Sequence, residues 1–262
     1  MFSPVIPSSG LVGWRFLQRT YDSQFSAFTQ TTQITRATDY FAEKIGSITS
    51  AEELVSDRRL LEVALGAFGL QDDINNRFFI QKILDEGTTN EDSLANRFTD
   101  ERYQNLSAAF GLGAGEESQL GQEGFAADII AKYQANSFEV ATGTQDETMR
   151  IALFSQREIP LLASEEGSND AKWFTIMGQP PLRAVFEKSL NLPSSFGQVD
   201  IDQQLVVFKQ RARQVFGSDE VSQFNTPEAV EDLVTKYIVR AQLDTFVNSS
   251  SSASIALTLL QS

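Results

Sequence analysis

The sequence contains neither histidine nor cysteine in 262 residues. Histidine is the one side chain whose unperturbed pKa lies in the physiological range, and cysteine is a strong nucleophile and a common zinc ligand. Their absence excludes Ser-His-Asp catalysis, thiol chemistry, disulfides and most transition-metal sites. We therefore expect a protein that is not an enzyme, with no catalytic, cofactor-binding or metal-binding residues and no cofactor.

Positive charge and long apolar runs are also scarce. The chain has 21 basic and 35 acidic residues, which gives a net charge of −14. Such a field repels phosphate backbones and anionic membrane surfaces, so no nucleic-acid partner is expected. No run approaches the ~18 consecutive apolar residues of a membrane span, and the first residues do not form a Sec-type signal peptide. The default localisation is cytoplasmic, and flagellar type III export without a cleaved signal is the alternative.

Apolar residues make up 41% of the chain, and 20 of them are phenylalanines, which is ample for a packed core. They recur at spacings of three and four residues through most of the sequence, the pattern of amphipathic helices. No Asn-Gly or Asp-Gly hairpin signal occurs. The sequence therefore predicts an all-α protein of roughly ten helices.

The first apolar stripe occupies one face of a predicted N-terminal helix. It consists of Trp14, Leu17, Tyr21, Phe25 and Phe28. Aromatic stripes at helical spacing usually form core, so the helix is expected to pack on its own module. The alternative is that the stripe binds a partner helix, which makes it the candidate protein-binding site of the chain.

Three further helices have predicted inward faces. A helix from about Asp73 is expected to bury Ile74, Phe78 and Ile83, and a helix opening at Asp200 is expected to bury Ile201 and Phe208. After the start signal Thr226-Pro227, a helix is expected to turn inward Val230, Val234, Tyr237, Ala241 and Leu243.

Helix ends are marked by capping and stop signals. Ser50 to Glu53 and Thr144 to Glu147 are predicted capping boxes. Gly69 is predicted to end its helix in a left-handed conformation, with Phe68 anchoring the core beside it. Pro160 is expected to end or kink the helix that contains it.

These signals predict four segments. They are a flexible N-terminus (1–12), a first helical module (13–115), a second helical module (116–247) and a mobile serine-rich tail (248–262). The identical stretches Ala67-Phe-Gly-Leu70 and Ala109-Phe-Gly-Leu112 suggest an internal repeat, and Leu60, Val63 and Leu70 are echoed by Leu182, Val185 and Leu192. Two related modules or convergent helix-stop chemistry both explain these matches.

Motifs for chemistry are few. The glycine-rich stretch from Gly111 to Gly115 follows a helix rather than a strand and lacks a P-loop lysine, so nucleotide binding is not expected. The carboxylate pairs Glu52-Glu53 and Asp72-Asp73 are explained by the helix dipole. Glu165-Glu166 lies in a predicted polar loop. A hard-metal site from oxygen ligands is conceivable but has no supporting motif.

Several stretches of the first 83 residues resemble a known family. They are Val12-Gly-Trp-Arg-Phe-Leu-Gln-Arg-Thr-Tyr21, Asp39-Tyr-Phe-Ala-Glu-Lys-Ile-Gly46, Ser56 to Leu70 and Asp73 to Ile83. The chain resembles an alphaproteobacterial family of unknown function whose genes often lie among flagellar genes. The resemblance implies no catalytic residues, because the family has no established activity.

The resemblance and the composition together favour a non-enzymatic, flagellum-associated structural or assembly protein with flagellar or export proteins as partners. One alternative is an export chaperone or adaptor that binds the termini of its partners. A second is an enzyme that uses carboxylates or magnesium without histidine or cysteine, which requires a cleft with converging carboxylates. The oligomeric state is not specified by these patterns.

Overall fold

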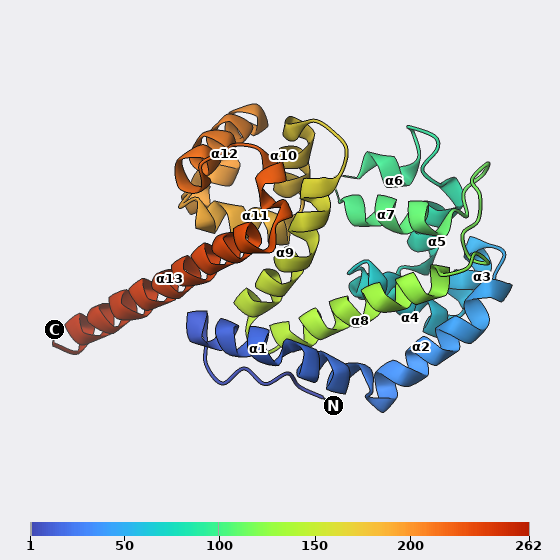
Figure 1. Ribbon diagram of the computed structural model, residues 1–262, viewed down its shortest axis with the longest axis horizontal. Coiled ribbons are helices and arrows are strands. Elements are labelled where there is room, and N and C mark those ends of the chain that lie inside the picture. The colour runs from blue at the N-terminus through green and yellow to red at the C-terminus, as the bar shows by residue number, and fades with distance from the viewer. Residues whose placement is uncertain (1, 99, 262) are drawn as a thin grey trace. The chain divides into compact units, whose positions relative to one another are not determined.

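The prediction of an all-α protein is confirmed by a computed structural model, which describes residues 2–98 and 100–261 and leaves out the side chains of Ser194 and of residues 248–261. The chain is 75% helical, and the described part contains no strand. Within the described residues there are 13 α-helices, of which 11 have seven or more residues, close to the predicted number; Figure 1 shows their arrangement.

The helices divide between two compact units. Unit 1 (residues 1–4 and 21–141) holds α2 (Thr32–Lys44), α3 (Ala51–Ser56), α4 (Arg58–Ala67), α5 (Arg77–Glu86), α6 (Leu94–Arg97), α7 (Glu101–Phe110) and most of α8 (Phe125–Gly143). Unit 2 (residues 5–20 and 142–262) holds α9 (Glu147–Ser164), α10 (Asn169–Gly178), α11 (Pro180–Ser189), α12 (Ile201–Phe216) and α13 (Pro227–Gln261). Helix α1 (Gly10–Thr29) contributes its first half to unit 2 and its second half to unit 1.

The contact boundary in α8 lies beyond the module boundary that the sequence predicts at residue 115. The reason is that α8 packs against α4. The Asn136 amide donates a 2.7 Å hydrogen bond to the Ala67 carbonyl, and Tyr133 lies so close to Gly66 that a Cβ there would meet its ring at 2.7 Å. At the chain's start, α1 begins at Gly10, and the Phe2 ring lies 5.8 Å from that of Phe28. The predicted mobile tail (248–262) falls outside the residues with described side chains and stays a prediction.

The core of unit 1 forms where short helices cross. Helix α2 packs on α4, α3 on α4 and α5, and α7 on α5 and α6. Aromatic rings fill the crossings: Phe110 lies 5.3 Å from Phe125, and Phe79 lies 5.3 Å from Tyr103. These edge-to-face contacts add about 0.5–1.5 kcal/mol each to the burial of their apolar area.

The core of unit 2 surrounds Trp173 of α10. Helix α9 packs against α11, α13 and the 3₁₀ segment η4 (Val221–Asn225), and α11 packs against α13. The fully buried Trp173 lies 5.1 Å from Phe186 and 5.7 Å from Phe208. Phe186 in turn contacts Phe224 at 5.4 Å, so one chain of rings joins four elements.

Left-handed residues end several helices, as the sequence predicts. Gly69 after α4 has φ +69° and Gly111 after α7 has φ +60°. The Leu70 amide then donates to the Leu65 carbonyl at 2.9 Å, the bond of a Schellman motif. Phe68 itself is only half-buried, and Leu70 fills the core position instead. The prediction that Phe68 anchors the core is therefore wrong.

The second half of the chain repeats this local architecture. Asn191 after α11 has φ +56°, and the Leu192 amide donates to the Glu187 carbonyl at 2.8 Å. Both stops follow helices of 10 residues and precede 3₁₀ segments of five residues, Gln71–Asn75 and Ser194–Gln198. The matches at Leu60/Leu182, Val63/Val185 and Leu70/Leu192 thus occupy equivalent places, which favours two related modules over convergence.

Several local predictions are wrong. Phe78 is 81% exposed, because residues 71–75 form a 3₁₀ segment and α5 begins only at Arg77, which rotates its inward face onto Ile80 and Ile83. Ile201 is exposed at the first position of α12, while Phe208 is buried as predicted.

Two predicted helix boundaries also need correction. The cap of α9 is Asp146 rather than Thr144: its carboxylate accepts the amides of Thr148 and Met149 at 2.9 and 3.3 Å. Helix α9 also continues through Pro160 to Ser164, so Pro160 does not end it, while a kink at Pro160 stays a prediction. The capping box at Ser50 is present, with the Ser50 hydroxyl accepting the Glu53 amide at 3.2 Å. The Glu53 carboxylate also reaches back: it accepts the Thr49 amide at 2.8 Å, and backbone hydrogen bonds from Thr49 and Ser50 both lower its pKa.

The two glycine stops allow a matched test. Both have positive φ, but a Cβ at Gly111 would lie 2.3 Å from the Glu117 carbonyl oxygen, whereas at Gly69 its nearest neighbour is 3.7 Å away. We expect Gly69→Ala to lower the free energy of unfolding by about 1 kcal/mol, the left-handed penalty alone. Gly111→Ala should cost roughly 2–4 kcal/mol, because the clash adds to that penalty.

Gly69→Asn is the control for the left-handed conformation, since Asn tolerates it and Asn191 adopts it in unit 2. It should cost less than Gly69→Ala in urea unfolding. If Gly69→Ala and Gly111→Ala lower the free energy of unfolding by the same amount, the added clash at Gly111 is contradicted.

Candidate functional site

The N-terminal stripe forms part of the chain's own core in this structure. Trp14 and Leu17 are fully buried in unit 2, and the rings of Tyr21, Phe25 and Phe28 lie 5.4–5.6 Å from Phe138 of α8 in unit 1. The structure thus divides the five stripe residues between two interiors instead of one surface. A partner-binding role for them stays a prediction, which requires α1 to leave both interiors.

The glycine-rich loop after α7 encloses an anion supplied by the chain itself. One oxygen of the Glu116 carboxylate accepts hydrogen bonds from the amides and hydroxyls of Thr88 and Thr89, among them the Thr88 hydroxyl at 2.9 Å and the Thr89 amide at 3.1 Å. The other oxygen accepts the Gly113 amide at 3.3 Å. This cradle of amides is the kind of group that binds a phosphate elsewhere, and here Glu116 fills it.

Burial by itself raises the pKa of Glu116, but the hydrogen bonds from Thr88, Gly113 and Thr89 outweigh it and leave that pKa below its usual range. Glu116 therefore stays ionised at neutral pH and ties the loop to the end of α5. A Cβ at Gly113 would lie 2.4 Å from the Gly87 Cα, so the two glycines allow the loops to meet. The glycine-rich stretch from Gly111 to Gly115 is thus held in place by Glu116.

The carboxylate pairs lie apart from one another and serve local structure. Glu53 belongs to the cap of α3, and Glu165 and Glu166 are exposed. Asp73 accepts the Tyr103 hydroxyl at 2.8 Å, and burial followed by this bond raises the pKa of Tyr103 to about 12. Over the described residues, no three acidic side chains gather in a way that could hold a metal ion.

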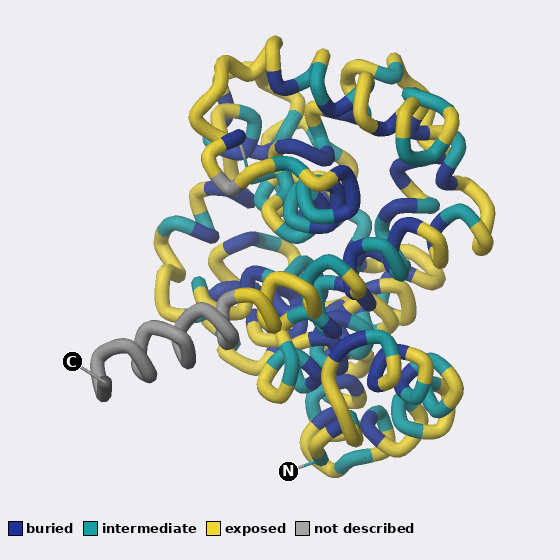
Figure 2. Tube along the Cα trace, turned by 90° about the vertical axis from the view of Figure 1, so that its left-hand side faces the viewer, coloured by how far each residue is buried: buried dark blue, intermediate teal, exposed yellow. Residues whose placement is uncertain are grey.

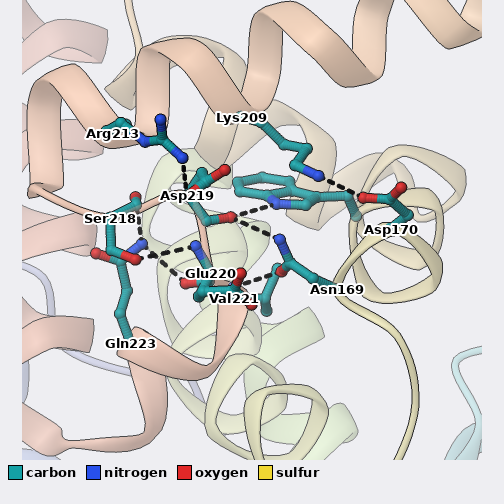
Figure 3. A network of polar contacts seen from close by, with 10 residues as sticks. Asn169, Asp170, Lys209, Arg213, Ser218, Asp219, Glu220, Val221 and Gln223 are labelled. Atoms are coloured by element: carbon teal, nitrogen blue, oxygen red, sulfur yellow. Dashed lines mark hydrogen bonds and ion pairs between the residues drawn. The ribbon is translucent and has the colours of Figure 1, made fainter.

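A polar network in unit 2 fastens the loop between α12 and η4 (Figure 3). The backbone carbonyl of Asp219 accepts the Trp173 indole N–H at 2.8 Å and the side-chain amide of Asn169 at 3.0 Å. The side-chain oxygen of Asn169 accepts the backbone amide of Val221 at 2.9 Å. Arg213 pairs with the Asp219 carboxylate at 2.8 Å, which lowers the pKa of that group. Lys209 pairs with Asp170 at 2.5 Å. The network positions the buried Trp173, and its charges are already paired.

The best candidate site is instead a stripe on α13. The helix buries Val230, Leu233, Val234, Tyr237 and Ile238 against its own unit. Beyond Ile238 the helix extends away from the core of unit 2, and most of its described side chains become exposed (Figures 1 and 2). Four large apolar residues of this stretch are exposed, with exposed fractions of 36%, 58%, 73% and 65%: Val239, Leu243, Phe246 and Val247. We call these four residues the α13 stripe.

Helical spacing places the α13 stripe on a face different from the buried one. Its members follow one another at intervals of four, three and one residues, so they share one side of the helix. This side of α13 points away from the side that carries the buried Val234 and Ile238. Single exposed apolar residues are ordinary, but a contiguous apolar face marks an interaction site.

Leu243 corrects a prediction, because the sequence pattern assigns it to the inward face. From Val239 onward the large apolar residues lie on the side of α13 that faces away from the buried residues, and Leu243 belongs to that side. The signal that could have found the site is the seven-residue interval from Val239 to Phe246, which continues to Ala253 and Leu260.

Helices with the length and apolar character needed to cross a membrane are absent from the described part of the chain. Residues 67–230 match a family described as protein of unknown function (DUF1217). The chain also resembles a solved structure, the crystal structure of a structural-genomics target from Agrobacterium tumefaciens. The identity is 23%, the TM-score is 0.74, and the match covers 92% of this chain and 99% of the other, so the fold is shared. No curated protein has a matching sequence.

The Glu116 cradle generates a pH-dependent prediction. Glu116→Gln should lower the free energy of unfolding by about 1–2 kcal/mol at neutral pH, since a partly exposed charged acceptor of several hydrogen bonds is lost. Because the pKa of Glu116 is lowered in the folded state, its contribution is full above the usual glutamate range and is lost as the pH falls through the lowered value.

Urea unfolding across the acid range checks this, with Glu117→Gln at the exposed neighbouring position as the control. The difference between the parent and Glu116→Gln should disappear at low pH. Two results contradict the role assigned to the cradle. One is a stability difference between the parent and Glu116→Gln that does not change with pH, and the other is the same pH-dependent loss in Glu117→Gln.

Proposed function

The chain belongs to the DUF1217 family of proteins of unknown function, and we propose that it is a non-enzymatic, flagellum-associated structural or assembly protein that binds a protein partner through the α13 stripe. The observation that carries the proposal is the exposure of Leu243, Phe246 and Val247 on one helix of a chain with net charge −14. Exposed large apolar side chains also occur elsewhere, such as Phe78 and Val206, but the α13 stripe places four of them on one side of a single helix.

A helical face of this kind suits protein recognition. Amphipathic helices bind grooves or other helices through apolar anchors at spacings of three, four and seven residues. Burial of each Val, Leu or Phe side chain contributes about 1.5–3 kcal/mol. Beside Leu243 of the stripe, Asp244 pairs with Lys188 of α11 at 2.5 Å, so this part of α13 still contacts its own unit on another side.

A non-enzymatic role is supported by the state of the carboxylates. Glu53, Asp57 and Glu116 accept backbone amides, and the hydrogen bonds outweigh burial where it opposes them, so that their pKa values are lowered. Carboxylates that act as general acids have raised pKa values. Asp146 and Asp200 are likewise engaged as caps of α9 and α12. These groups perform structural work that explains their positions.

The flagellar part of the proposal is supported by the sequence resemblance, whose family has genes that often lie among flagellar genes. An export chaperone would also use an apolar helix face, and it differs in what it binds: the terminus of an exported subunit rather than an assembled structure. Co-purification after crosslinking separates the two, because only an assembly component stays with isolated flagellar structures.

The proposal predicts the outcome of complementation in a motile bacterium that carries the gene. A deletion strain should swim poorly, and the parent chain should restore swimming. Leu243→Asn combined with Phe246→Asn should fail to restore it, although the protein stays folded, because both side chains are exposed. The matched control is Val206→Asn combined with Phe78→Asn, which makes the same chemical change at exposed positions of α12 and α5.

Carboxylate variants test the enzymatic alternative in the same strain. Asp72→Asn with Asp73→Asn, and Glu165→Gln with Glu166→Gln, should leave swimming near the parent level. A carboxylate variant that melts normally and reproduces the deletion phenotype supports an enzyme instead. Normal swimming of the deletion strain contradicts the flagellar assignment.

A further inference from the structure

The loop after α5 contains hydrogen-bond donors that converge on one anion. The backbone amides and hydroxyls of Thr88 and Thr89 all donate to one carboxylate oxygen of Glu116, and the Gly113 amide donates to the other. Backbone amides that point into one concavity form the kind of nest that binds anions. These donors therefore make up an oxyanion-binding site, and a carboxylate of the chain itself occupies it.

Two buried glycines leave the space in which this carboxylate lies. A Cβ atom at Gly87 would lie 2.7 Å from the carboxyl carbon of Glu116, and a Cβ atom at Gly113 would lie 2.9 Å from one of its oxygens. Gly87 also has φ +69°, a conformation that favours glycine. Any larger residue at either position would fill part of the cradle, so the backbone of the two loops provides the room for the anion.

The segment that carries Glu116 is open to solvent. Ala114 and Gly115 are exposed, and a Cβ atom at Gly115, which has φ +84°, would meet nothing within 4 Å. On the opposite side of the cradle Thr89 is exposed as well. A dissolved anion can therefore reach the donors, and the glycines beside Glu116 allow the backbone to bend and release its side chain.

We propose that the Thr88–Thr89–Gly113 cradle is a binding site for a carboxylate ligand, which Glu116 closes from within and which an external carboxylate opens by taking its place. The present occupant identifies the ligand class, because its two oxygens match the two groups of donors. When the exchange takes place, the segment between α7 and α8 loses the contact that ties it to the end of α5.

The charges near the cradle favour a carboxylate over a phosphate. All five donors are uncharged, so the cradle brings no formal positive charge to its ligand. Glu86 directly precedes the loop that contains Thr88, and Glu117 directly follows Glu116. A phosphate carries more than one negative charge at neutral pH and is repelled more strongly by these two residues than a singly charged carboxylate is.

Titration of the full chain with sodium acetate tests the site, with the amide NMR signals of Thr88, Thr89 and Gly113 as the readout. Glu116→Ala empties the cradle, and acetate should then shift all three signals with a dissociation constant in the millimolar range. The parent should bind acetate roughly tenfold more weakly, because its site is free only in the fraction of molecules in which Glu116 has left it. Sodium chloride at the same concentration is the control for ionic strength.

Two variants separate the cradle from the loss of one charge. Glu117→Ala removes the same charge at an exposed neighbouring position and should behave as the parent does. Thr88→Val in the Glu116→Ala background removes one hydroxyl donor at nearly unchanged volume, and it should weaken acetate binding about fivefold or more. Acetate should also raise the urea midpoint of Glu116→Ala above its effect on Glu117→Ala, because a ligand that binds only the folded state stabilises it.

Three results overturn the proposal. If acetate up to about 100 mM leaves the three amide signals of Glu116→Ala unchanged, the donors do not form a site without Glu116. If the parent binds acetate as tightly as Glu116→Ala does, Glu116 does not close the site. If sodium phosphate binds Glu116→Ala more tightly than acetate does, the ligand class is wrong. None of these results involves the α13 stripe, so the site and the proposed function are tested separately.

Discussion

Abrupt left-handed helix ends are the constraint on which the packing of both units depends. Helices of 10 residues such as α4 and α11 pack against several neighbours each, so the chain must turn sharply after them to bring the next element close. Gly69 and Gly111 in unit 1 and Asn191 and Gly217 in unit 2 supply these turns with positive φ angles. Because the turns are tight, aromatic side chains from several directions meet at the crossings, as Trp173, Phe186 and Phe208 do in unit 2.

This way of packing also determines where the chain can bind a partner. Its described part has no strand edge, so recognition has to use the side chains of a helix face. Most helices bury their apolar face against a neighbouring helix of the same unit. Helix α13 continues beyond the core of unit 2, and from Val239 onward its described apolar side chains face solvent. Association that covers them removes the cost of that exposure and orders the helix along its length.

Features with a strong local cause could be predicted from the sequence. The helical class, the left-handed conformation of Gly69 and the caps at Ser50 and Asp200 each depend on neighbouring residues only. The N-terminal stripe is predicted either to pack on its own module or to bind a partner helix. In the structure Trp14, Leu17 and Phe28 are buried, and Tyr21 and Phe25 are half-buried.

Features that depend on tertiary context could not be predicted. The inward face of α5 changes because a 3₁₀ segment precedes it, and Leu243 is exposed because it lies on the side of α13 away from the buried Val234 and Tyr237. The Glu116 cradle joins residues 28 positions apart, and no local motif signals it. The α13 stripe escapes prediction for the same reason, although its heptad interval is present in the sequence.

Hydrogen exchange of the α13 amides, with and without isolated flagellar structures, tests the central claim most directly. Amides of residues 239–247 should exchange quickly in the protein alone, where the stripe faces solvent, and slowly once the flagellar structures are added. Amides around Leu233, inside unit 2, should exchange at the same rate in both samples. Exchange at residues 239–247 that the flagellar structures do not change contradicts the claim that the α13 stripe binds a protein partner.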